Sequence, residues 1–331
     1  MRKTLFILLF LQFSFGIFAQ KDSIPYTLFR NKIILFQDLG FKTTPFTISG
    51  VFNKNIESLT YINNPRLMYS IGAKYKWISG RVSIAIFGNM LSLKKYGKTN
   101  QFNIGFNFTI RKYFFDVDLT AASGYTLLNA NNWSSSDYQI NSNMSNIDYS
   151  LKTWYFHNKH LKMDLIKGKT GIYNKQVMSW YVKSSFNIFN LNNENQTIIP
   201  YQLIDSTNTK QQSTSFSSVE LTLTPGFAYV NRFKNWQYSF LLGFGGAIQL
   251  KNHYSPASNR TFVGLAPRFD FRLNAGYNVP KFYSFLSVEY DNKSVSFNEL
   301  SYYQNYISVN LTFGVRLKTF KEWKNENFNA Y

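Results

Sequence analysis

The chain has three histidines, and their spacing suggests two kinds of chemistry. His157 and His160 stand three residues apart, which on a helix would supply two ligands to a metal ion. The surrounding sequence has no helical periodicity and no third ligand, so we expect loop histidines and no metal site. His253 stands near Ser255 and Ser258, and a serine–histidine pair oriented by a third polar group is the centre of a lipid hydrolase. This motif is unspecific, and we expect no catalytic residues.

Gly243-Phe244-Gly245-Gly246 weakly resembles a phosphate-binding glycine loop. It falls inside an alternating apolar segment and no helix follows it, as a phosphate loop would require. Glycines inside a strand make room for a neighbouring group or let the strand bend. We therefore expect these glycines to give space inside a wall, and we expect the protein to carry no cofactor.

Charged residues that alternate with apolar ones are the more informative polar groups. By parity with the apolar positions they should all point to one face, which we expect to be the interior of a barrel. They are Lys74, Lys76, Arg81, Arg111, Asp116, Asp118, Lys183, Glu220, Arg268, Asp270, Arg272, Glu289, Arg316 and Lys318. Two readings stay open: a polar pore that excludes cations, or charges that pair across a narrow lumen and fill it.

The elements that would position these charges are strands with two different faces. Residues 307–317 alternate strictly between apolar and polar side chains, and 102–110 and 263–277 do the same. Such runs match a tilted membrane strand of about 9–11 residues. Weaker copies occur at 31–39, 69–77, 82–86, 113–119, 178–188, 197–206, 219–229, 236–250 and 282–290. The sequence therefore predicts an all-β, antiparallel, up-and-down transmembrane β-barrel of about 12 strands, although Pro200 suits a central strand poorly.

Connection lengths indicate the orientation of these strands, because membrane barrels have short periplasmic turns and long external loops. The expected inner turns are 78–80, 111–113, 191–196, 231–235 and 278–281. The expected outer connections are 40–66, 91–98, 123–175, 207–215, 251–260 and 291–301, each longer than its neighbouring turns. The Asn- and Ser-rich segment 123–175 is expected to be an external loop or an inward-folded plug.

The N-terminus has the pattern of an export signal. Arg2 and Lys3 precede a short apolar run that closes on Ala19, which predicts a cleaved signal peptide over residues 1–19. A helical anchor is the alternative, but the run is shorter than the ~20 apolar residues that spanning needs. The barrel is expected over 31–320, after a periplasmic lead at 20–30 and before a periplasmic tail at 321–331.

Composition points to a wall between lipid and water. Aromatic residues make up 19% of the chain and charged residues only 16%. The formal net charge of +19 suits anionic lipid headgroups and lipopolysaccharide phosphates, and after an export signal it does not indicate nucleic acid. Aromatic side chains gather at strand ends beside the expected inner turns, where an interfacial girdle belongs. They are Tyr75, Trp77, Tyr113, Trp180, Trp236, Tyr277 and Phe282.

Short motifs spread along the chain resemble one family. Asn64-Pro65 leads into Gly72-Ala73-Lys74-Tyr75-Lys76-Trp77, and Arg111-Lys112 precedes Asp116-Val117-Asp118-Leu119. Gly276-Tyr277-Asn278 comes before Phe282, and the last strand contains Phe313-Gly314-Val315-Arg316. In this order the motifs resemble DUF4421, an uncharacterised family of predicted outer-membrane barrels. The resemblance implies a barrel and assigns no activity.

These observations lead to one expected function and two alternatives. We expect a monomeric, non-enzymatic barrel of the outer membrane, inserted by the barrel-assembly machinery, that acts as a channel, a small-solute transporter or a structural component of the envelope. The first alternative is a barrel that hydrolyses or acylates lipids. The second is a soluble, secreted β-sandwich that binds a ligand.

Overall fold

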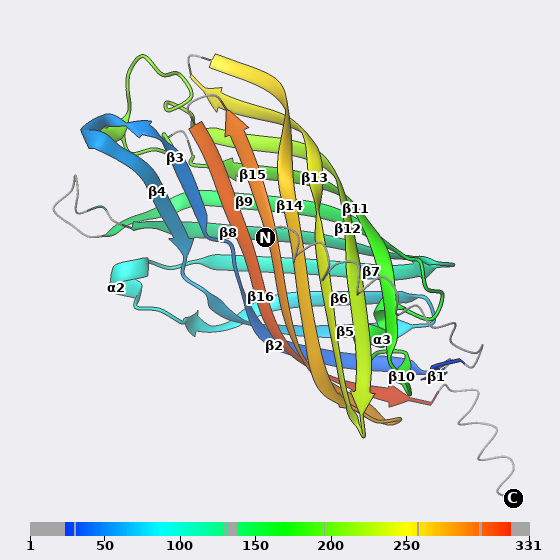
Figure 1. Ribbon diagram of the computed structural model, residues 1–331. Helices are drawn as coiled ribbons and strands as arrows, with labels where there is room; N and C mark the ends of the chain where they lie inside the picture. The colour runs from blue at the N-terminus through cyan, green and yellow to red at the C-terminus, as the bar shows by residue number, and fades with distance from the viewer. Residues whose placement is uncertain are drawn as a thin grey trace, which may run out of the picture.

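The computed structural model describes residues 24–29, 31–128, 130, 138–194, 196–256, 258–297 and 300–318. The expected signal peptide and C-terminal tail lie outside these residues. Among the described residues, no helix is long and apolar enough to cross a membrane. The molecule is an elongated barrel of antiparallel strands, drawn in Figure 1 with its long axis running from upper left to lower right.

Twelve strands form the closed ring, and each pairs with the next along the chain. They are β2 (Ile33–Thr43), β5 (Arg66–Tyr75), β6 (Ile78–Asn89), β7 (Asn100–Ile110), β8 (Tyr113–Leu128), β9 (Tyr138–Phe156), β11 (Val177–Asn192), β12 (Ser215–Phe233), β13 (Trp236–Ser255), β14 (Ser258–Asn278), β15 (Phe282–Phe297) and β16 (Leu300–Leu317). The ring closes where β16 pairs with β2, from Ile307 opposite Thr43 to Leu317 opposite Ile33. The predicted antiparallel barrel of about 12 strands is confirmed.

A hairpin completes the wall at one end. Strands β5, β6 and β7 have 10, 12 and 11 residues, whereas β12, β13 and β14 have 19, 20 and 21. Above the short strands, β3 (Phe46–Phe52) pairs with the start of β16, and β4 (Ile56–Asn63) pairs with the end of β8. The hairpin thus spans from β16 to β8 and replaces the missing upper parts of the strands between them (Figure 1).

Short helices and one small sheet lie in the connections. They are the 3-10 turn η1 (Asn53–Asn55), α2 (Leu93–Tyr96), α3 (Met163–Ile166) and the 3-10 turn η3 (Tyr201–Leu203). In the small sheet β1 (Tyr26–Leu28) pairs with β10 (Gly171–Tyr173). Because the start of β2 and the end of β16 lie at the end of the barrel that carries α3, this end is periplasmic by the usual orientation of membrane barrels.

The strand count was right because two errors compensated. The segment 123–175 is not one external connection, since it contains the whole of β9. β9 runs from the outer end toward the periplasm. Its outer half, around Asn143, is polar on both faces, and Trp154 and Phe156 point inward, so its alternation is broken. Conversely, 197–206 is not a strand: it contains Pro200 and η3 and belongs to an external connection.

These two corrections change the orientation of one strand and the site of the long periplasmic connection. β11 runs away from the periplasm, and the connection between β9 and β11, which holds α3 and β10, is periplasmic. The outer connections expected at 251–260 and 291–301 are mostly strand, because β13 reaches Ser255 and β15 reaches Phe297. Length alone misplaced these connections, because polar residues such as Asn252 and Asn292 continue the strands and interrupt the apolar alternation.

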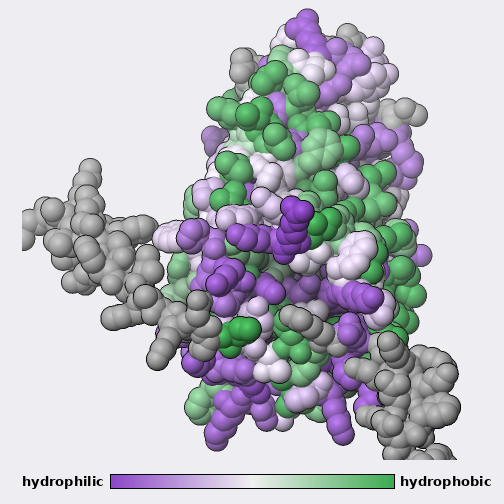
Figure 2. All heavy atoms as spheres, turned by 90° about the vertical axis from the view of Figure 1, so that its right-hand side faces the viewer, coloured by the Kyte–Doolittle hydropathy of each residue, from purple (hydrophilic) through white to green (hydrophobic). Residues whose placement is uncertain are grey.

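The outside of the barrel is apolar. Large hydrophobic side chains are exposed at alternate positions around the ring, such as Phe102 and Ile104 on β7, Leu242 and Phe244 on β13, and Leu265 on β14. In Figure 2, hydrophobic residues dominate the upper middle of the face, and hydrophilic residues gather at the top and toward the periplasmic end. A band of this kind is the surface that a barrel presents to lipid.

Candidate functional site

The interior of the barrel holds most of the charged residues that parity assigned to it. The side chains placed there are Lys74, Arg81, Asp116, Asp118, Lys183, Glu220, Arg268, Asp270, Arg272, Glu289 and Arg316, and each forms an ion pair or a hydrogen bond. The other three were assigned wrongly. Lys76 and Arg111 occupy two-residue turns with positive φ, and Lys318 follows β16; all three are exposed at the periplasmic end. Parity does not extend past the last strand residue, because turns break the alternation.

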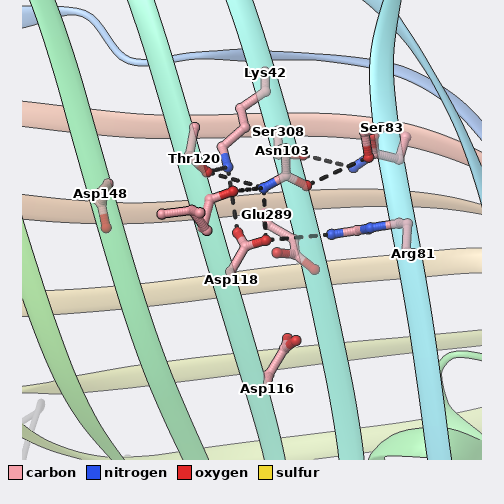
Figure 3. Close-up of polar contacts among 12 residues, drawn as sticks. Lys42, Arg81, Ser83, Asn103, Asp116, Asp118, Thr120, Asp148, Glu289 and Ser308 are labelled. Atoms are coloured by element: carbon pink, nitrogen blue, oxygen red, sulfur yellow. Dashed lines mark hydrogen bonds and ion pairs between the residues drawn. The ribbon is translucent and has the colours of Figure 1, made fainter.

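Asp118 on β8 is the centre of one cluster (Figure 3). Its carboxylate lies 3.4 Å from Lys42 Nζ and 3.8 Å from the guanidinium of Arg81, and accepts a hydrogen bond of 2.7 Å from Asn103. Arg81 also lies 3.7 Å from Asp38. Side chains from β2, β6, β7 and β8 therefore meet in the lumen, where Figure 3 shows them pointing toward one another.

A second cluster surrounds Lys183 on β11. Its Nζ lies 2.7 Å from Asp270 on β14 and 3.2 Å from Asp291 on β15. Arg272 lies 3.2 Å from Glu289 and 3.7 Å from Asp270, and its guanidinium stacks 4.7 Å from the ring centroid of Trp154. Lys183, Asp270 and Arg272 are each buried, so their charges depend on these partners rather than on water.

Two further pairs extend this layer of charge toward the outer end. Glu220 contacts Arg268 and accepts a hydrogen bond of 2.6 Å from Gln249. Lys293 contacts Asp148 across the lumen from β15 to β9. Together with the clusters around Asp118 and Lys183, these pairs form what we call the ionic layer.

Several members of the ionic layer were missed by the sequence analysis. Asp38 lies on a strand whose alternation is weak, and Lys42 falls in the expected outer connection 40–66. Asp148 lies on β9, which the sequence does not predict, and Asp291 and Lys293 fall in the expected outer connection 291–301. Extending the parity of β15 beyond Tyr290 would have found the last two. The register of β9 against β8 carries no comparable signal in the sequence.

The outer end of the lumen is filled by apolar side chains, which we call the outer plug. The hairpin contributes Phe46, Ile48, Leu59 and Tyr61, and the connection between β11 and β12 contributes Ile198, Ile199, Leu203 and Ile204. These residues pack against the inward faces of the surrounding strands. Tyr61 donates a hydrogen bond of 2.6 Å to the carbonyl of Ile198, which ties the connection to the hairpin.

The periplasmic end is filled by the segment 161–173, which we call the inner plug. Leu161, Met163, Leu165 and Ile166 are buried against Phe114, Trp154, Tyr181 and Leu241 of the wall. Side chains from strands around the ring bind the polar groups of the inner plug. Lys74 lies 3.1 Å from Asp164, Gln237 donates 2.8 Å to the carbonyl of Leu165, and Arg316 donates 2.9 Å to the carbonyl of Lys169.

The three histidines lie on β13 and at the start of the periplasmic connection. His253 lies 3.4 Å from Ser213, and both side chains are only 1% exposed. The Ser213 hydroxyl donates to the carbonyl of Lys210 at 2.6 Å, so its proton is already engaged. His157 and His160 begin the periplasmic connection. In the described part of the chain, no three His, Cys, Asp or Glu side chains are grouped to hold a metal ion.

The glycine-rich run of β13 makes room for an aromatic ring. A Cβ atom on Gly243 would lie 2.6 Å from the hydroxyl oxygen of Tyr181, and one on Gly226 of β12 would lie 2.4 Å from its Cζ atom. Tyr181 on β11 pairs directly with Gly226, and its buried ring lies along the inner wall over β12 and β13. The two glycines therefore accommodate a large inward side chain in a narrow barrel.

The aromatic residues expected at an interface share one end of the barrel. Tyr75, Tyr113, Trp236 and Phe282 lie at periplasmic strand ends, and Trp77 lies in a periplasmic turn. Trp180 and Tyr277 are at this same end. Trp180 is there because β11 runs outward from the periplasm. Their role at a lipid interface stays a prediction.

Solved structures of outer-membrane proteins are similar to this chain at low identity. The outer membrane protease OmpT from Escherichia coli aligns with 9% identity and a TM-score of 0.37, over 89% of this chain and 99% of that one. An outer membrane channel from Pseudomonas putida F1 aligns with 11% identity and a TM-score of 0.34, over 90% and 100%. The β domain of the Bordetella autotransporter BrkA aligns with 9% identity and a TM-score of 0.35, over 86% and 98%. Likenesses this low assign no residue role.

The family comparison is more specific. No curated protein matches the sequence. The model of the family described as "Domain of unknown function (DUF4421)" matches residues 20–317, nearly the whole described chain. The resemblance inferred from the motifs is therefore confirmed, and this chain belongs to the DUF4421 family.

Proposed function

We propose that this protein is a non-enzymatic barrel of the outer membrane with a closed lumen, a structural component of the envelope rather than a diffusion pore. The observation that carries the proposal is the stacking of three fillings along the barrel: the outer plug, the ionic layer and the inner plug. Each spans the lumen between strands on opposite sides of the ring.

The pairing of the lumen charges supports closure. An anion-selective pore needs cations that face water and meet a passing ion. Here Lys42, Lys183, Arg268, Arg272 and Lys293 each contact a carboxylate. Buried charges stay ionised in a narrow lumen when such partners replace their hydration. The ionic layer is thus organised as packing.

The outer surface supports the expected partners. The apolar band contacts lipid, and the basic chain is attracted to anionic headgroups and lipopolysaccharide phosphates. Because β16 pairs with β2, the ring is closed and presents no unpaired strand edge to which a second copy of the chain could add. We propose a monomer, delivered by an export signal and inserted by the barrel-assembly machinery.

Conductance tests closure directly. The purified protein, reconstituted in a planar bilayer, should produce no stable conductance steps, while a general porin prepared in the same way should produce them. Sustained, ohmic steps from the wild-type protein would overturn the closed lumen.

Phospholipid turnover tests the absence of catalysis. The reconstituted protein should release no fatty acid from labelled phospholipid vesicles, because the Ser213–His253 pair is buried and has no third group in the described contacts that orients His253. Turnover that is lost in His253→Ala would instead establish the hydrolase and refute the proposal.

A further inference from the structure

A cavity of about 500 Å³ lies at the periplasmic mouth, beside the inner plug. It opens to the outside and is lined by the residues from the end of β1 to the beginning of β2, the turns after β5 and β7, the segment 156–164 and Thr170. The inner plug occupies the rest of the lumen at this depth, and the cavity lies between the plug and the wall. Its volume is in the range of small-molecule binding pockets, about 300–1,000 Å³.

The floor of the cavity is apolar. Ile34, Phe114, Phe156, Leu161 and Met163 line it, and each is at most 4% exposed in total, so they form the tightly packed bottom of the cavity. They come from β2, β8, β9 and the inner plug, so the floor is built where the plug meets the wall. A surface of this kind favours an alkyl or aromatic group over a hydrated one.

The rim of the cavity is cationic. The basic residues that line it are Lys32, Lys76, Arg111, Lys112, Lys159 and Lys162. Asp164 is the single acidic residue of the lining, and its carboxylate is already bound by Lys74 at 3.1 Å and Thr109 at 2.9 Å. The rim therefore carries a strong excess of positive charge around an apolar recess.

We propose that this cavity binds a single-chain anionic amphiphile, with its phosphate or carboxylate head at the cationic rim and its alkyl chain against the apolar floor. Arginine and lysine bind both head groups through charge-assisted hydrogen bonds. A peptide would bring backbone amides against the apolar floor without partners, which is costly. The cavity opens on the periplasmic side of the inner plug, so its occupancy is independent of whether the lumen conducts.

Two turn residues make a precise test of the rim. Lys76 and Arg111 have φ angles of 51° and 53°, a conformation that asparagine adopts readily, so Lys76→Asn with Arg111→Asn removes two charges without straining the turns. Lys234 occupies the corresponding turn between β12 and β13 with φ of 54° and lies outside the cavity lining. Lys234→Asn is therefore the matched control.

The experiment uses the full barrel in an amphipol, since detergent micelles would absorb the probes. Octyl phosphate, octanoate, octyl glucoside and inorganic phosphate are titrated by calorimetry. Octyl phosphate or octanoate should bind at least about ten-fold more tightly than octyl glucoside or inorganic phosphate. The tighter of the two anions then indicates whether a phosphate-bearing lipid or a fatty acid is the source of the ligand.

The variants decide where binding occurs. The double variant should weaken anion binding at least about ten-fold, and Lys234→Asn should leave it unchanged. Thr170→Trp, which fills the cavity from the plug side, should abolish binding while heat-modifiable gel mobility shows a folded barrel. Equal binding of octyl glucoside and octyl phosphate, no binding of either anion, or an equal loss in Lys234→Asn would each overturn the proposal.

Discussion

The Nζ atom of Lys74 lies 3.1 Å from Oδ2 of Asp164, which joins β5 of the wall to α3 of the inner plug across 90 positions of sequence. Both side chains are largely withdrawn from solvent. A buried ion pair is weak evidence of net stability, but its disruption leaves one charge without a partner. The contact therefore fixes where the inner plug sits.

Replacing Lys74 with methionine should destabilise the barrel by about 3–5 kcal/mol, because in the described part of the chain the Asp164 carboxylate then keeps a hydrogen bond from Thr109 but no cationic partner within ion-pair distance. The double variant Lys74→Met with Asp164→Leu should recover most of this loss, since no buried charge remains. Urea unfolding followed by gel mobility measures both. Additive losses in the double variant would show that the pair does not act as a unit.

A second prediction concerns Gly314 on β16, which lies directly opposite Tyr283 on β15. A Cβ atom at Gly314 would lie 2.2 Å from Cζ of the Tyr283 ring. Gly314→Ala should therefore cost about 1–3 kcal/mol through overpacking. Adding Tyr283→Leu should relieve the clash, so Gly314→Ala should lower the free energy of unfolding less in this background than in the wild type.

Gly80→Ala is the control for this experiment, because a Cβ atom there meets nothing within 4 Å. It should change the unfolding midpoint little. If Gly80→Ala and Gly314→Ala destabilise the barrel equally, the cost reflects strand propensity rather than the ring of Tyr283.

The outer plug depends on the hydrogen bond from Tyr61 to the carbonyl of Ile198. Tyr61→Phe should cost about 1–3 kcal/mol, because it leaves that buried carbonyl unsatisfied. Tyr69→Phe is the matched change on the outer face, where the hydroxyl bonds to Gln37 in an exposed position at 2.8 Å, and it should cost far less. Equal unfolding midpoints for the two variants would contradict the assigned role of Tyr61.

Lys169 should make stability depend on pH. Burial, and after it the charge of Lys167, lowers the pKa of Lys169 to about 7 from 10.5, while Asp38 and Asp164 oppose the shift and Arg81 adds to it. Between these values the unfolded chain binds the proton and the folded one does not, so stability should rise as pH rises from about 7 to 10.5.

The measurement for Lys169 is a comparison of urea midpoints across pH 6–10. Lys169→Met should be more stable than wild type at neutral pH and should lose the part of the pH slope that Lys169 causes. Parallel pH profiles for the two proteins would mean that this lysine keeps its charge in the folded barrel.

The sequence alone predicted the barrel, its approximate strand number and the direction of most side chains. Alternation is a local property, since a strand with lipid on one side and a lumen on the other needs two kinds of residue in turn. The strand 307–317 shows this most clearly, and its pairing with β2 closes the ring as the pattern implied. The family resemblance rested on equally local motifs.

Only the tertiary structure decided what fills the lumen. Whether Lys183 meets Asp270, or Lys74 meets Asp164, depends on register and curvature accumulated over many strands, and no short window of sequence contains that information. For the same reason the sequence predicts an external loop or a plug over 123–175, whereas this segment contains β9 and the inner plug of the periplasmic end. Parity determines that a charge points inward, whereas the path of the whole chain determines which partner it finds there.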